Sequence, residues 1–476
     1  MRQQLAALVI SSTVSGCSLL YNPNSIDLPR SDALDGPDSI DASPPNLELT
    51  DVGPRILLEG QGVGGSRPAI LTITGQGFVD GVQVQLIVPG GEVVMFVVDN
   101  ANIAISPARD VIAVPVLLSV DVARGPGMVP LTVRVTQGAV TKMLDGKVQL
   151  HNLNELTDTA VTDSALLDSL YSRIDHPTLI TFAVTPNKPA ARFRAVSSIV
   201  LGDVTANATA AAAGPGGATG GAVGTTGGGS GGGAGSLVGG AGGGGFSVAG
   251  ANGAAGGGMG GAQIGEPLIR GYATNHGSGG GGGNGSVGGG SGGTIEVTAG
   301  GTVRVGKLEV NGANAAAGGV SGGGGGSGGV VLIRAGTSAE LTGPITANPG
   351  AGSPGTGVAG GTGRSGRIRI DVPLVIGTPQ ITPPAHLGMS LDPSSPRSTT
   401  NAMQPVVAYG TLDDAFNVFV VDAEGIGTSQ TTVAFGTTTT SIRPMLSAGY
   451  NHVCVTANGT HTVDEATNCI DLAYLP

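Results

Sequence analysis

The chain has 476 residues and a formal net charge of −11, and 88 glycines with 29 prolines make up about a quarter of it. Only 3 % of its residues are aromatic, so one large enzyme core is not expected. The negative charge argues against a nucleic-acid partner. There is no run of 18 apolar residues that would predict a membrane-spanning helix. Because 64 of the glycines fall between Leu201 and Ile370, at least three regions of different composition are expected.

The first residues have the pattern of an export signal. A basic start is followed by the apolar run Leu5–Ile10 and then by small residues. Val14–Cys17 reads VSGC and resembles the lipobox of bacterial lipoproteins, which implies a signal peptide over residues 1–16 and lipidation of Cys17. The resemblance implies a membrane partner and a location in the cell envelope, and Ser18 favours the outer membrane, with a periplasmic or surface-exposed chain. A non-lipidated secretory signal and a short buried helix are the alternatives.

Residues 17–50 are rich in proline and aspartate and are expected to be a disordered tether. Such a segment buries too little apolar surface to offset the entropy lost on ordering. The aspartates loosely resemble a calcium loop but lack the closing glutamate of an EF-hand, so a solvated spacer is the favoured interpretation.

Residues 51–150 carry short alternating apolar runs separated by turn residues, which predicts a β-sandwich. The segment Leu71–Val84 reads LTITGQGFVDGVQV and resembles the opening of IPT/TIG domains, an immunoglobulin-like family. We expect its glycines to take positive φ and Phe78 to plug the end of the sandwich. The resemblance implies a module that spaces, binds or adheres and has no catalytic residues of its own.

A repeat runs through residues 196–377. Gly293–Gly300 aligns with Gly329–Gly336, 36 residues later, and with Gly366–Asp371, a further 37 residues on. The stretch before it, residues 151–195, is polar and mildly helical and is expected to link to or cap the repeat.

A second short element of the repeat ends in asparagine at Asn207, Asn311 and Asn348. A fixed repeat of this length predicts a Gly-rich parallel β-helix, in which each coil has two short strands and the asparagines form a ladder along the stack. The glycine runs are expected to be loops thrown out from one edge. Paired polyglycine-like segments are one alternative, and a disordered linker is another for Gly214–Gly292.

Sequence motifs for catalysis are weak in this region. Gly228–Gly232 matches G-x-S-x-G but does not lie between a strand and a helix, so we interpret it as an accident of composition. A carbohydrate-active β-helix needs clustered carboxylates, and the four glutamates are far apart in sequence: Glu266, Glu296, Glu309 and Glu340. Glu309 and Glu340 are the pair that would meet across coils, although a solvent-facing ladder is the favoured interpretation. Phe246 and Tyr272 are the aromatic residues available to stack on a sugar.

Residues 378–476 return to ordinary composition, and their alternating runs predict a second β-sandwich, Ig-like in class only. Cys454 and Cys469 lie in two strand-like runs, which predicts a disulfide across a hairpin in an exported chain. His452 and His461 lie close by in sequence, so a metal site is the rival interpretation, but the spacing lacks the paired ligands of structural zinc. Four acidic residues could hold a cation, and exposed loop carboxylates explain them as well: Asp413, Asp414, Asp422 and Glu424.

These features favour a non-enzymatic, lipid-anchored protein of the cell envelope with a structural or adhesive role. In arrangement and composition the chain resembles Gly-rich bacterial lipoproteins. We expect no catalytic residues, no cofactor and no metal. The expected partners are the membrane, through Cys17, and a surface glycan or protein. The alternative function is that of a carbohydrate-binding or carbohydrate-active β-helix protein.

Overall fold

All regular secondary structure in the described residues is strand, apart from two short 3-10 helices, η1 (Asn100–Asn102) and η2 (Ser164–Leu167). The computed structural model describes residues 46–63, 65–88, 96–118, 126–157, 161–167, 169–182, 184, 188–264, 276–410, 415–434, 438–457 and 469–476. The prediction of an all-β chain is therefore confirmed.

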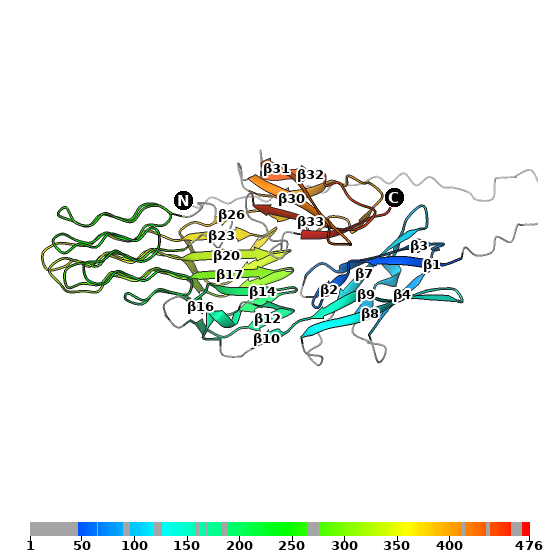
Figure 1. Ribbon diagram of the computed structural model, residues 1–476, viewed down its shortest axis with the longest axis horizontal. Helices are drawn as coiled ribbons and strands as arrows, with labels where there is room; N and C mark the ends of the chain where they lie inside the picture. Colours follow the sequence, from blue (N-terminus) through cyan, green and yellow to red (C-terminus); the bar gives the residue numbers. More distant parts are fainter. Residues whose placement is uncertain are drawn as a thin grey trace, which may run out of the picture. The chain divides into compact units, whose positions relative to one another are not determined.

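Two sheets form the first part of the described chain (Figure 1, blue to cyan). One has the strand order β1-β3-β7-β5, with β6 beside β7, and the other has the order β2-β9-β8-β4. Buried apolar side chains from both sheets share one hydrophobic core. The strands are β1 (Glu48–Gly53), β2 (Ile56–Leu58), β3 (Ala69–Gln76), β4 (Gln83–Ile87), β5 (Phe96–Val98), β6 (Ala104–Ile105), β7 (Val111–Leu118), β8 (Gly127–Gln137) and β9 (Val140–Asn152).

Glycine shapes the turn after β3. Gly77 and Gly81 have φ angles of +77° and +82°, as predicted, where L side chains are strained. Phe78 is fully buried in the core. Gly75 has a different purpose, because a Cβ there would lie 2.0 Å from the carbonyl oxygen of Glu48 on β1. Glycine at this position therefore allows β1 and β3 to pair.

Three parallel sheets follow, and each strand pairs with the equivalent strand of the next repeat. The first sheet contains β10 (Glu155–Thr157), β12 (Arg173–His176), β15 (Ile199–Leu201), β18 (Thr302–Val305), β21 (Ser338–Leu341) and β24 (Val375–Ile376). The second contains β11 (Leu170–Tyr171), β14 (Ala191–Ala195), β17 (Thr294–Ala299), β20 (Val330–Ala335), β23 (Arg367–Asp371) and β26 (His386–Leu387). The third contains β13 (Ile180–Thr181), β16 (Val204–Thr205), β19 (Leu308–Glu309), β22 (Ile345–Thr346) and β25 (Ile381–Thr382).

The strand register agrees with the repeat in the sequence. Ile295 on β17 pairs with Val331 on β20, which pairs with Ile368 on β23. In the third sheet, Leu308 pairs with Ile345. All five side chains are buried in one core, so equivalent apolar positions stack from repeat to repeat.

Each repeat has three strands rather than the two that we expected. The additional strand, β18, has buried Val303 and Val305 on either side of exposed Arg304, a pattern too short to be distinctive in the sequence. Residues 151–195 also differ from expectation, because within their described part they are helical only at η2 and supply strands β10 to β14 to the same three sheets. Pairing with the next repeat outweighs the weak helical pattern.

The predicted asparagine ladder is confirmed. Oδ1 of Asn207 accepts a hydrogen bond from the backbone N–H of Asn311 at 2.6 Å, and Oδ1 of Asn311 accepts one from the backbone N–H of Asn348 at 2.8 Å. The backbone amide that follows each strand of the third sheet is thus satisfied by the preceding repeat.

Four extended glycine segments leave the parallel sheets (Figure 1, green to yellow); we call residues 214–264, 276–293, 312–329 and 349–363 the glycine bundle. Six consecutive N–H groups, those of residues 240–245, donate to neighbouring segments with a period of three. Residues 240 and 243 donate to the segment 251–254, 241 and 244 to 322–325, and 242 and 245 to 231–234. Three residues per turn is the repeat of a polyproline II helix, so each segment presents successive faces to three neighbours.

At buried glycines such as Gly243 and Gly245, the spacing within the glycine bundle leaves no room for a side chain. A Cβ on Gly243 would lie 2.1 Å from the carbonyl oxygen of Thr362, and a Cβ on Gly245 would lie 2.2 Å from that of Ala262. The described glycine runs are therefore paired, polyglycine-like segments, the first alternative from the sequence, and not a disordered linker.

Two further sheets end the chain, with the strand orders β27-β29-β32 and β28-β34-β33-β30-β31, and share a third core. Ala473 and Leu475 from this part pack against Ile70 and Val111 of the first sheet. The strands are β27 (Ser390–Leu391), β28 (Ser398–Thr399), β29 (Val406–Tyr409), β30 (Ala415–Asp422), β31 (Gly427–Ala434), β32 (Thr439–Ile442), β33 (Gly449–Ala457) and β34 (Cys469–Tyr474).

Candidate functional site

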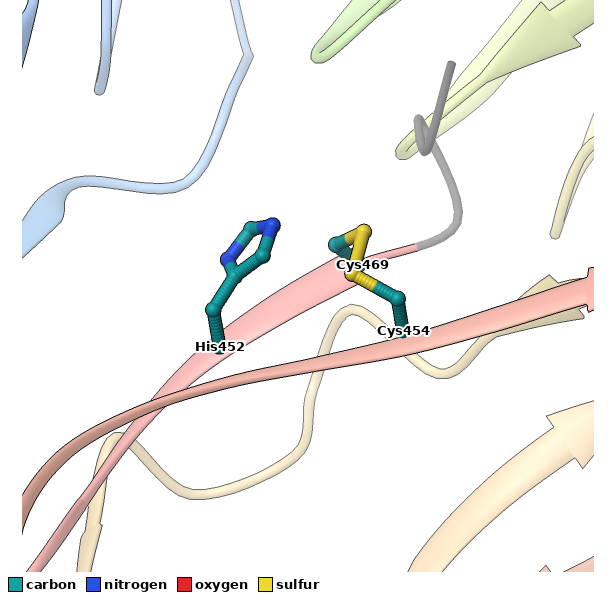
Figure 2. Close-up of side chains that lie close together, drawn as sticks. All are labelled: His452, Cys454 and Cys469. Carbon is teal, nitrogen blue, oxygen red and sulfur yellow. A yellow bond between two sulfur atoms is a disulfide. The ribbon is translucent and has the colours of Figure 1, made fainter. Parts of the chain in front are cut away.

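A disulfide joins the last two strands, β33 and β34. Cys454 and Cys469 face each other directly in the antiparallel register, and their sulfur atoms are 2.08 Å apart. Figure 2 shows the imidazole of His452 beside this bridge. The cysteine pairing predicted from the sequence is present, and it links neighbouring strands of one sheet.

A carboxylate fixes the orientation of His452. Nδ1 of His452 lies 2.7 Å from Oδ1 of Asp471, and the Tyr450 hydroxyl donates a hydrogen bond of 2.8 Å to the same oxygen. Burial, reinforced by the negative charge of Asp471, raises the pKa of the Tyr450 phenol well above its ordinary value. The three side chains hold β33 and β34 together on the same hairpin as the disulfide.

The rival metal interpretation can be tested against this geometry. Ligand atoms of His452, Cys454 and Cys469 lie within 4.8 Å of one another. Cysteine binds metal as a thiolate, however, and both sulfur atoms are used in the disulfide. The oxidised site therefore offers the imidazole alone.

A network of buried charges lies on β17, β20 and β23. Arg334 is within 3.8 Å of the Glu296 carboxylate and 3.6 Å of the Asp371 carboxylate, and Arg369 bonds Asp371 at 2.7 Å. The side chains of both carboxylates are at most 3 % exposed. Because each carboxylate faces a guanidinium, the network is suited to holding adjacent repeats together. Sequence reasoning missed it, although the repeat alignment places Arg334 opposite Asp371.

The two glutamates considered as a pair from the sequence lie in different sheets and have different ionic partners. Glu309 lies on β19 and Glu340 on β21, in different sheets. Glu309 pairs with Lys307 of its own repeat at 3.3 Å, and Glu340 pairs with Arg304 of the preceding repeat at 3.5 Å.

Phe246, one of the two aromatic residues considered for stacking on a sugar, is not accessible to a ligand. Phe246 is fully buried, and the guanidinium carbon of Arg367 lies 4.5 Å from the centre of its ring.

Asp422 has a local role, because its carboxylate accepts hydrogen bonds from the backbone N–H groups of Glu424 and Ile426. The other candidates lie outside the described residues: Cys17 with the predicted signal and most of the tether, Glu266, Tyr272, Asp413, Asp414 and His461.

Exposed aliphatic side chains occupy the turns of the glycine bundle: Val223, Leu237, Val238 and Val320 are 46–88 % exposed. The turns are neighbours, since Leu237 packs on Gly224 and the Ser321 hydroxyl donates a hydrogen bond to the carbonyl oxygen of Ser236. The bundle contains no Asp, Glu, Lys or Arg. These turns form an uncharged apolar surface, which we call the bundle turns.

The described helices are all too short to cross a membrane. No family model, curated protein or solved structure matches the chain.

Proposed function

We propose that the chain is a non-enzymatic, lipid-anchored protein of the cell envelope with a structural or adhesive role. In this proposal Cys17 carries the lipid, residues 17–50 are the tether, and the three parallel sheets are a β-helix. The sheet pairs within residues 51–150 and 378–476 are Ig-like β-sandwiches on either side of it in sequence.

The interlocked glycine bundle is the observation that carries the proposal. Its segments are bound backbone to backbone, at distances that exclude a Cβ at glycines such as Gly243 and Gly245, so the bundle is suited to be a rigid arm. The arm presents uncharged aliphatic side chains on its turns. Exposed apolar surface of this kind often marks a site of interaction.

The bundle turns provide the test. Leu237→Ser combined with Val238→Ser removes the two adjacent aliphatic side chains, which are 56 % and 88 % exposed, and leaves the backbone hydrogen bonds between the glycine segments in place. We expect cells that carry this variant to lose adhesion to neighbouring cells or to a glycan-coated surface, while the amount of envelope-bound protein stays the same.

The matched control is Leu374→Ser combined with Ile376→Ser, at aliphatic side chains that are 56 % and 45 % exposed beside and on β24. This control should keep wild-type adhesion. Equal adhesion for both variants, or turnover of a glycan by the purified protein, would contradict the proposed role.

A further inference from the structure

A hollow of about 470 Å³ lies where three parts of the described chain meet. Its walls are the turn Gly65–Pro68 before β3, Thr337 before β21, and the loop Pro393–Arg397 between β27 and β28. Small-molecule sites commonly have volumes of about 300–1,000 Å³. The hollow therefore has the size of a site for a small organic ligand.

Arg67 supplies an unmet donor to this hollow. Its Nη2 donates a hydrogen bond of 2.9 Å to the carbonyl oxygen of Ser395, which fixes the guanidinium. Its Nη1 is buried and has no hydrogen-bond partner in the described part of the chain. Burial lowers the pKa of Arg67 below its ordinary value, which reflects the loss of water around the charge. A buried donor left without an acceptor destabilises the fold, so an acceptor supplied by a ligand would be favourable.

Thr337 and Arg397 also line the hollow. The Thr337 hydroxyl is buried and is without a hydrogen-bond partner among the described residues. Arg397 is exposed at the rim, and its positive charge acts on Arg67. The residues that line the hollow thus include two arginines and a threonine whose hydroxyl has no partner among the described residues.

The nearby carboxylates are bound elsewhere. Asp392 and Asp471 act on Arg67 through their charge. Oδ1 of Asp392 accepts hydrogen bonds from the backbone N–H and the hydroxyl of Ser394. Oδ1 of Asp471 is taken by Tyr450 and His452. Among the described residues, neither carboxylate forms an ion pair with Arg67 or Arg397, so an outside anion can take that place.

We propose that this hollow binds the carboxylate or sulfate group of an anionic sugar. A guanidinium fork matches the two oxygens of such a group, and Nη1 of Arg67 is the donor that it would satisfy after a small movement of the surrounding side chains. The Thr337 hydroxyl suits a sugar hydroxyl. The apolar faces of Pro68, Pro393 and Pro396 suit the C–H groups of the ring.

Titration calorimetry on the full chain at low salt tests the proposal with three probes: methyl glucuronoside, methyl glucoside and inorganic sulfate. The two sugars differ only by the carboxylate. We expect the glucuronoside to bind more tightly than either other probe, and its affinity to fall as salt is added. Equal binding of both sugars, or binding of sulfate without the glucuronoside, would overturn the assignment.

Variants locate the binding. Arg67→Gln and Arg397→Gln should each weaken glucuronoside binding about 10- to 100-fold, and Thr337→Val should weaken it less. Because Arg397 is exposed, its variant keeps the test decisive even where Arg67→Gln unfolds. Arg304→Gln, at an arginine side chain that is 60 % exposed on β18, is the control and should bind as the wild type does. Unchanged binding in Arg397→Gln, or an equal loss in Arg304→Gln, would overturn the proposal.

Discussion

At the scale of single residues, the packing of the glycine bundle depends on the missing Cβ at buried glycines such as Gly243. In Gly243→Ala the new Cβ would meet the Thr362 carbonyl oxygen at 2.1 Å, and both partners are backbone. We expect the bundle to lose about 1–3 kcal/mol of stability, because neither segment can move without breaking its hydrogen bonds. Amide hydrogen exchange measured across the bundle would report the loss.

Gly357→Ala is the matched control. Gly357 is exposed, and the nearest atom to its Cβ would be the Val320 carbonyl oxygen at 3.3 Å. Its exchange protection should stay close to that of the wild type. Equal protection in Gly243→Ala and Gly357→Ala would contradict the packing described for the bundle.

Ionisation of Tyr450 is expected to lower the free energy of unfolding at alkaline pH. Its pKa is raised by burial and by Asp471, so the folded state favours the neutral phenol. That contribution is complete below the ordinary tyrosine pKa of about 10 and is lost as the pH rises above it. We expect the free energy of unfolding, measured in urea, to fall more steeply between pH 9 and 11 for the wild type than for Tyr450→Phe. Tyr409→Phe on β29 is the control and should follow the wild type. An equal fall in the free energy of unfolding for Tyr450→Phe and wild type would contradict this role of Tyr450.

At the scale of elements, the asparagine ladder holds the third sheet in register. Asn311→Ala removes the acceptor for the Asn348 backbone N–H and should cost about 1–2 kcal/mol. Exchange of the amides in β19 and β22 measures this loss. The control is Asn46→Ala, at an exposed residue near the start of the described chain, which should leave the exchange protection of β19 and β22 unchanged. Equal protection of these strands in both variants would count against the ladder.

The disulfide stabilises a different element. Cys454 and Cys469 are 15 residues apart, and closing a loop of that length contributes about 3 kcal/mol. In Cys454→Ser combined with Cys469→Ser, we expect exchange protection to fall in β30, β33 and β34 and to stay unchanged in the three parallel sheets. A loss spread evenly over the whole chain would show that the bridge is not a local constraint.

The sequence predicted these elements where side chains carry a pattern. The short apolar runs of residues 51–150 and 378–476 indicated strands, and the repeat of Ile295, Val331 and Ile368 indicated the register. The strand β18 was missed because its apolar pattern is too short.

Candidate sites were harder to predict than strands. The cysteine pair was found because one hairpin holds both residues. The charge network of Glu296, Arg334 and Asp371 was missed because its members are brought together only by stacking of the repeats. Arg67, Thr337 and Arg397 are farther apart still in sequence, and no local motif marks them.

At the scale of the whole molecule, the arrangement of the glycine bundle was the least predictable part. Glycine carries no side chain, so a glycine run has no apolar pattern to show which segments are neighbours. Backbone hydrogen bonds with a period of three determine which segments lie next to one another. Composition alone did indicate a region unlike its flanks.

The proposed function depends most on export and anchoring through Cys17. Mass spectrometry of the native protein extracted from membranes tests this directly. The account predicts a chain that begins at Cys17, carries acyl groups on that residue and holds Cys454 and Cys469 oxidised. A chain that still begins at Met1, with three unmodified thiols, would contradict it.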